Sequence, residues 1–177
     1  MRTFSFLCVV ALLTAGCSSD QRVATLVDRA AVQDTVTRLF VATDNRDWNG
    51  VRAVLADSVL IDMTSTAGGV PIRVSSQQIT KTWDEDLRGL KAIHHQEGNM
   101  LVSLRDGEAD VSCYGIAVHY LPNPSGMNSR SFVGTYDFHL VKRPDGWKIN
   151  LFRFNLKYLS GNMNLQEYLK EKEGKEK

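Results

Sequence analysis

The sequence has few residues of the kinds that cross-link a chain or give it a strong charge. Its 177 residues include only three cysteines and four prolines, and 21 basic residues against 20 acidic ones leave a formal net charge of +1. Nonspecific nucleic-acid binding needs a basic surface field, which this balance does not supply. A hydrophobic share of 43% is ordinary for globular proteins and excludes a disordered, collagenous or coiled-coil chain. We therefore expect one globular domain, no nucleic-acid partner, and a function that lies in a local site.

The motifs of several common enzyme classes are also missing. There is no glycine-rich phosphate loop, no Gly-x-Ser-x-Gly elbow, no Cys-x-x-Cys pair and no His-Glu-x-x-His. Nucleotide, serine-hydrolase, redox and zincin chemistries therefore lack support. The four histidines do not have metal-ligand spacing, so we expect neither a metal nor a cofactor.

The N-terminal residues predict an export signal. The apolar run 4–13 follows a basic residue and is too short to cross a bilayer as a helix, which is typical of a signal peptide over residues 1–16. The small residues that end at Cys17 resemble a bacterial lipobox, although Thr14 stands where a large aliphatic residue is usual. We expect lipidation of Cys17, a polar tether over 17–22, and a cell-envelope location at the outer membrane or periplasmic face. The alternative is ordinary cleavage, with a secreted or periplasmic product.

This interpretation also leaves one cysteine in the mature domain. Cys8 would leave with the signal peptide and Cys17 would carry lipid, so Cys113 would have no disulfide partner. Cys113 lies in an apolar run, where a cysteine is usually a small buried hydrophobe.

The pattern of apolar residues predicts helices first and strands afterwards. Expected elements are an amphipathic helix from Val23 to near Asn45, a short helix capped by Asp47, a strand over 59–63, a third helix whose capping box is Ser75-x-x-Gln78, and strands over 95–104, 109–120, 131–142 and 147–156. This order predicts an α+β domain over 23–165, with helices covering one face of a largely antiparallel sheet. Residues 166–177 are expected to form a charged, solvated tail.

Alternation along the strands divides the histidines between faces. His94 and His95 are adjacent, so their side chains should point to opposite faces. His119 shares a small, apolar face with Ala109, Val111, Cys113 and Ala117, whereas Asp110, Ser112 and Tyr114 share a wetter one. Asp137 lies on the same, partly apolar face of the next strand as His139. A lone histidine on an apolar face is more often a core residue than a catalyst, so the spacing of these residues does not by itself assign them a catalytic role.

Several short motifs together resemble one family. They are Asp44-Asn45-Arg46-Asp47-Trp48, Val59-Leu60-Ile61-Asp62, His95-x-x-Gly98-Asn99, Ala117-Val118-His119, Gly134-x-Tyr136-Asp137 and Asp145-Gly146-Trp147-Lys148-Ile149. Their order and spacing resemble the SnoaL-like branch of the nuclear transport factor 2-like superfamily over about residues 28–165. The resemblance implies a cone: a strongly curved, mostly antiparallel sheet packed on three N-terminal helices and enclosing an apolar pocket.

Within that superfamily the pattern is most similar to the scytalone-dehydratase-like lyases. The resemblance implies a catalytic set of Asp44, His95, His119 and Asp137, with the histidines as an acid/base pair and Asp44 as their orienter. The reaction implied is metal-free removal of water from a small cyclic, polyketide-, steroid- or terpenoid-like substrate.

The pocket implied by the resemblance departs from the dehydratases at two positions. Their two carbonyl-activating tyrosines are replaced by Thr43 and Met63, so the donor must come from elsewhere, with Asn99, Tyr114 and Tyr136 as candidates; Trp83 completes the predicted substrate-binding residues. These departures leave alternatives open: a noncatalytic, envelope-tethered pocket for a small apolar ligand, an association module, or a ketosteroid-isomerase-like isomerase. A sheet-to-sheet homodimer is common in the family and is an expectation here.

Overall fold

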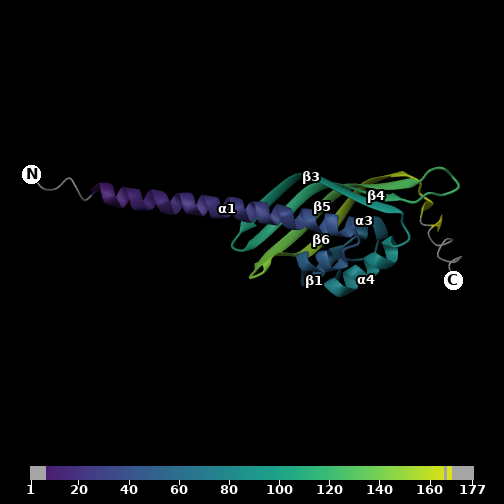
Figure 1. Cartoon of the computed structure of the whole chain (residues 1–177), viewed down its shortest axis with the longest axis horizontal. Coiled ribbons are helices and arrows are strands. Elements are labelled where there is room, and N and C mark those ends of the chain that lie inside the picture. Colours follow the sequence, from purple (N-terminus) through teal and green to yellow (C-terminus); the bar gives the residue numbers. More distant parts are fainter. Residues whose placement is uncertain (1–6, 166, 169–177) are drawn as a thin grey trace, which may run out of the picture.

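A long helix leads into the domain. The computed structural model describes residues 7–165 and 167–168, and in it helix α1 spans Leu7–Asp44. Its first turns project away from the rest of the molecule (Figure 1). The polar segment 18–22, expected as a tether, is helical because no glycine or proline interrupts the chain between Cys17 and Asp44. The helix ends at Asp44, where the sequence predicts an end near Asn45.

The domain buries one face of this helix. Val32, Val36, Leu39 and Phe40 are at most 3% exposed and recur at helical spacing. The opposite end of the hydrophobic pattern, at Val23, stays exposed. The part of α1 that matters for the site is therefore its last three turns.

Three shorter helices follow α1. They are α2 (Trp48–Val54), α3 (Thr64–Ala67) and α4 (Ser76–Leu87). Both predicted cap residues are confirmed: the Asp47 carboxylate accepts a hydrogen bond from the Gly50 backbone N–H at 2.9 Å, and the Ser75 hydroxyl accepts one from the Gln78 N–H at 3.1 Å. The Gln78 side chain bonds Thr82, so the second half of the capping box does not form. The single turn α3 is not predicted by the sequence pattern.

Six strands form one curved sheet in the order β2-β1-β6-β5-β4-β3. The strands are β1 (Leu55–Asp62), β2 (Ile72–Ser75), β3 (Ala92–Arg105), β4 (Glu108–Tyr120), β5 (Ser129–Arg143) and β6 (Gly146–Gly161). All neighbours pair antiparallel except β1 and β6, which are parallel. The four-strand meander and the largely antiparallel sheet are confirmed, whereas β2 is missed because it is short and mostly exposed.

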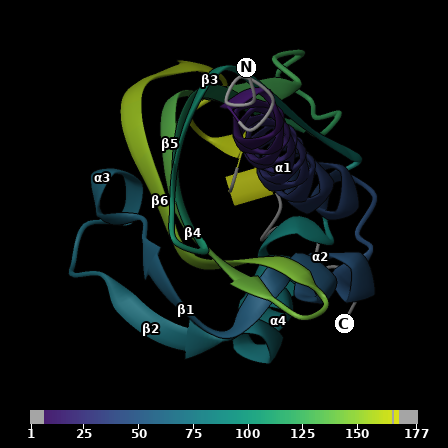
Figure 2. The same cartoon turned by 90° about the vertical axis from the view of Figure 1, so that its left-hand side faces the viewer.

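The sheet curls around α1, so its concave face meets the helices (Figure 2). Along β4, Ala109, Val111 and Cys113 are at most 2% exposed, while Asp110, Ser112 and Tyr114 on the other face are exposed. The predicted alternation is thus correct. The α+β cone expected from the sequence is the observed architecture.

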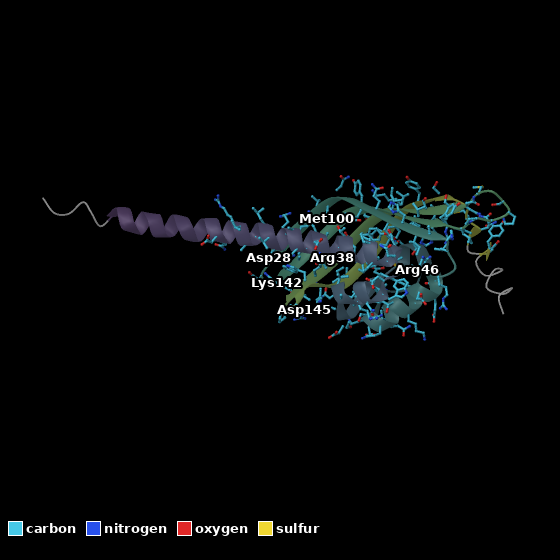
Figure 3. All side chains as sticks on the ribbon, in the orientation of Figure 1. Asp28, Arg38, Arg46, Met100, Lys142 and Asp145 are labelled. Atoms are coloured by element: carbon cyan, nitrogen blue, oxygen red, sulfur yellow. The ribbon has the colours of Figure 1, made fainter. Side chains whose placement is uncertain are left out.

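Polar contacts join the far end of the sheet to α1. The Lys142 ammonium lies 2.6 Å from a carboxylate oxygen of Asp28, and the two side chains meet beside the β5–β6 hairpin (Figure 3). At the opposite end, Leu90, Ile93, Leu121 and Leu165 form a second small core. The Asp28–Lys142 contact ties α1 to the β5–β6 hairpin, whereas the second core joins the end of α4 to the sheet and the C-terminal segment.

Three sequence predictions fall wholly or partly outside the described residues. They concern residues 1–6 of the expected signal peptide, the side chain of Cys17, and residues 166 and 169–177 of the expected tail. Among the described residues, no helix has both the length and the apolar character needed to span a membrane.

Candidate active site

An apolar cavity of about 200 Å³ opens between α1, α4 and the concave face of the sheet. An engineered apolar cavity of about 150 Å³ holds benzene, so this volume suits a molecule of one or two rings. The lining residues are mostly aromatic or aliphatic: Phe40, Thr43, Met63, Thr66, Trp83, Asp86, Leu87, His95, Ala117, His119, Phe132, Tyr136, Phe152 and Phe154. The few polar groups among them therefore decide what the cavity can do.

The carboxylate of Asp44 holds His95 at two points. One oxygen lies 2.6 Å from the ring Nδ1, and the other accepts the backbone N–H of His95 at 2.8 Å. The adjacent His94 has 70% of its side chain exposed against 12% for His95; its Nδ1 lies 3.8 Å from Asp44, beyond hydrogen-bond distance. Because Nδ1 of His95 is bonded to the carboxylate, Nε2 is the nitrogen left for a ligand.

His119 lines the same cavity from β4. It lies directly opposite Arg130 in the β4–β5 ladder, so the two side chains share the concave face. Burial, together with the positive charge of Arg130, lowers the pKa of His119 to about 4. The ring is therefore neutral near pH 7, where it can both donate and accept a hydrogen bond. The structure thus brings His95 and His119 to one cavity, and Asp44 contacts His95 without lining the cavity itself.

Four of the six predicted substrate-binding residues also line the cavity: Thr43, Met63, Trp83 and Tyr136. The Thr43 hydroxyl is buried and bonds the backbone carbonyl of Leu39 at 2.8 Å, one turn earlier in α1. No described residue hydrogen-bonds the Tyr136 hydroxyl, and burial raises its pKa, so this hydroxyl stays protonated. Tyr136 is thus the donor available to a bound molecule.

The other predicted residues lie elsewhere. Asp137, predicted as a catalytic residue, does not face the cavity. Its side chain points to the convex face of the sheet, where the carboxylate accepts a hydrogen bond from Asn155 at 2.8 Å. The more strongly apolar face of β5, with Tyr136 and Phe138, is the one that meets the helices. Tyr114 is 56% exposed on the convex face, and Asn99 sits in a β-bulge of β3 with φ 53°. These three residues do not reach the cavity.

Two polar lining residues, Thr66 and Asp86, are absent from the sequence prediction, and Asp86 is the charged one. It lies in the last turn of α4, three residues after Trp83, and both residues line the cavity. Helical spacing from Trp83 is the signal that could have found it.

The remaining cysteine does not add a nucleophile to this site. Cys113 is free and buried, as expected, and burial raises the pKa of its thiol to about 12, so it is not a nucleophile near neutral pH. The described residues contain no group of three or more His, Cys, Asp or Glu side chains placed to hold a metal ion.

The curved sheet on N-terminal helices, with an acid–histidine pair in its pocket, defines a protein of the nuclear transport factor 2-like fold. A SnoaL-like domain model matches residues 24–153, so the chain belongs to the SnoaL-like family. No curated protein matches the chain.

Solved structures share this fold at low sequence identity. The Kfla4162 protein from Kribbella flavida is 24% identical with a TM-score of 0.77, covering 81% of this chain and 99% of its own. A candidate scytalone dehydratase from Novosphingobium aromaticivorans is 16% identical with a TM-score of 0.67, covering 78% of this chain and 89% of its own. The hexachlorocyclohexane dehydrochlorinase LinA-type3 from Novosphingobium barchaimii is 13% identical with a TM-score of 0.65, covering 80% and 94%. These likenesses show that the chain shares its fold with all three structures.

Proposed function

We propose that the chain is a cofactor-independent lyase, which removes water from a small cyclic substrate by the acid/base chemistry of His95. The observation that carries the proposal is the Asp44–His95 pair, joined at 2.6 Å at the wall of an apolar cavity that also contains His119. A histidine fixed by a carboxylate and open at its other nitrogen is the arrangement of a general base.

The proposed reaction begins with proton transfer. Nε2 of His95 takes a proton from the carbon next to the substrate carbonyl, and the electrons of that C–H bond form the new double bond as the C–O bond breaks. The departing hydroxyl takes the proton from the imidazolium and leaves as water, which restores the neutral ring. The Asp44 carboxylate stabilises the positive charge that the ring carries between these steps.

Two neutral groups would assist this transfer. The protonated Tyr136 hydroxyl can donate a hydrogen bond to the substrate carbonyl, in the role that Thr43 and Met63 cannot fill. His119, neutral near pH 7, can donate to the leaving hydroxyl. The surrounding phenylalanines exclude water, which strengthens each of these hydrogen bonds.

A screen of small cyclic β-hydroxy ketones tests the proposal, with loss of water followed by mass spectrometry. For a substrate so found, we expect His95→Asn and Asp44→Asn each to lower kcat/KM about 10²- to 10⁴-fold. His94→Asn is the matched control, because this side chain is 70% exposed and its Nδ1, 3.8 Å from Asp44, makes no hydrogen bond with that carboxylate; its loss should leave the rate within about two-fold. A His95→Asn variant as active as this control would reject the proposal.

One observation favours a second candidate, a pocket that binds an apolar ligand without chemistry. At the two positions where the dehydratases have carbonyl-activating tyrosines, this cavity has the occupied hydroxyl of Thr43 and the thioether of Met63. Native mass spectrometry of the purified protein separates the candidates: a copurified ligand released unchanged, with retention insensitive to His95→Asn, favours binding alone.

A further inference from the structure

The carboxylate of Asp86 stands apart from its acidic neighbours in α4. Asp84 accepts a hydrogen bond from the Trp48 indole at 2.9 Å, and Glu85 is exposed, whereas Asp86 lines the cavity. Among the described residues, no donor or cation is paired with Asp86. Like Glu85, Asp86 is exposed to solvent, so it is an unpaired carboxylate at the open rim of the apolar cavity.

Such a group gains from a hydrogen-bond donor on a bound molecule. Partial burial and the negative charge of Glu85 raise the pKa of Asp86, because both disfavour its charged form. Asp86 also lies at the C-terminal end of α4, where the backbone carbonyls add negative potential. A ligand hydroxyl at the rim can replace water as the hydrogen-bond donor to this exposed carboxylate, whereas the negative charge of Asp86 repels a ligand carboxylate.

Asp86 lies on a different side of the cavity from His95 and His119. His95 and His119 come from β3 and β4, while Asp86 comes from α4, which covers β6 through the contact of Trp83 with Phe152, their ring centroids 5.7 Å apart. A molecule in the cavity therefore meets the proposed base on the sheet and a hydrogen-bond acceptor on the helix.

We propose that Asp86 is the specificity-determining residue of this site: it accepts a hydrogen bond from a hydroxyl of a small, neutral ring compound and disfavours carboxylate-bearing analogues. The proposal rests on the proposed function, since it names the substrate class of the same cavity. Small alcohols of one or two rings fit both the acceptor and the volume of about 200 Å³.

Isothermal titration calorimetry near pH 7 with 2-naphthol and 2-naphthoate tests the proposal, because the two probes share a ring system and differ in charge. The measured quantity is the ratio of the naphthoate Kd to the naphthol Kd. We expect the wild-type protein to prefer naphthol and Asp86→Asn to reduce the ratio about ten-fold, since a hydrogen bond to a charged group is replaced and the repulsion is removed. Asp86→Ser is a second variant with the same expectation.

Glu85→Gln is the matched control, because it removes the same charge one residue away from an exposed side chain outside the cavity lining. If selectivity depends on direct contact between Asp86 and the ligand and not on net charge, the ratio of the two Kd values for Glu85→Gln should stay within about two-fold of wild type. Equal ratios for wild type and both Asp86 variants, or no wild-type binding of naphthol, would overturn the proposal.

The same titration separates this proposal from the proposed lyase activity. His95→Asn should abolish turnover while leaving the Asp86-dependent ratio intact, because binding selectivity does not need the base. A preference for naphthol that depends on Asp86, with no turnover of any substrate, would reject the lyase activity and support the role of Asp86. Turnover without that preference would support the lyase activity and reject the role of Asp86.

Discussion

Phe40 and Asp44, one turn apart on α1, hold the same imidazole from two directions. The Phe40 ring stacks on His95 with centroids 5.0 Å apart and an interplanar angle of 24°, while Asp44 bonds the ring edge at 2.6 Å. Residues at i and i+4 share a helix face, so one short helical segment fixes both the plane and the edge of the ring. The orientation of His95 is therefore set before any ligand binds, as a positioned base requires.

This arrangement predicts the tautomer of His95. At about pH 8 we expect the proton on Nδ1 and a bare Nε2, because Nδ1 faces a carboxylate that can only accept. Nitrogen-15 NMR distinguishes the two tautomers, and the four histidines of the chain make the spectrum tractable. The exposed His94, whose Nδ1 lies 3.8 Å from Asp44 without a hydrogen bond, should show a mixture of tautomers. A His95 signal typical of a protonated Nε2 would contradict the geometry.

The Tyr136 hydroxyl should matter for rate and not for stability. Since no described residue hydrogen-bonds this hydroxyl, Tyr136→Phe should change the free energy of unfolding by less than about 1 kcal/mol. Loss of a donor to a developing enolate should lower kcat about 10²-fold. Urea denaturation measures the first quantity and turnover of a substrate from the screen measures the second. A large loss of stability at an unchanged rate would assign the hydroxyl a structural role.

Much of the fold follows from local patterns in the sequence. The caps at Asp47 and Ser75, the meander, and the apolar face of β4 are all readable, because each depends on residues close together in the chain. The parallel pairing of β1 with β6 is not, since it joins residues about 90 positions apart, such as Ile61 and Phe152.

The site can be predicted only in part, because only some of its residues are placed by local patterns in the sequence. Strand alternation correctly predicts that His95 and His119 face the interior. The family resemblance places Asp137 there too, but the opposite face of β5, which has the larger aromatic residues, is the one that packs inward. Asn99 was misplaced because the bulge in β3 breaks the alternation. Asp86 is exposed, as a charged residue near a helix end usually is; that it also borders the cavity depends on how α4 packs on the sheet, which the local pattern does not predict.

The low pKa of His119 predicts a stability that depends on pH. In the unfolded chain the ring takes up a proton near pH 6.5, but the folded ring resists protonation down to about pH 4. The unfolded state thus binds more protons in this window, so stability is lost as the pH falls from about 6.5 towards 4. Above this pH range the His119 ring is neutral in both the folded and the unfolded state, so it causes no loss of stability there.

Urea denaturation at pH 7 and pH 5 measures this loss. We expect His119 to account for up to about 2 kcal/mol of the decrease in the wild-type protein. His119→Gln should show a correspondingly smaller decrease, whereas His94→Gln should keep the wild-type one because its side chain is 70% exposed. Equal decreases in all three proteins would mean that the folded state protonates His119 freely.

Gly115 gives the last prediction, since the ring of Tyr136 occupies the space that a side chain would need. A Cβ at this position would lie 2.0 Å from Cε2 of Tyr136 and 2.3 Å from its Cδ2, far inside contact distance. Gly115→Ala must therefore push the ring, which lines the cavity, and should cost about 1–3 kcal/mol of unfolding free energy. Gly98→Ala on β3 is the matched control, because nothing lies within 4 Å of its Cβ, and it should be neutral or slightly stabilising. Calorimetry with 2-naphthol should show weaker binding to Gly115→Ala alone, since the displaced ring changes the shape of the cavity. If both alanine variants unfold and bind alike, the Tyr136 ring does not lie over Gly115.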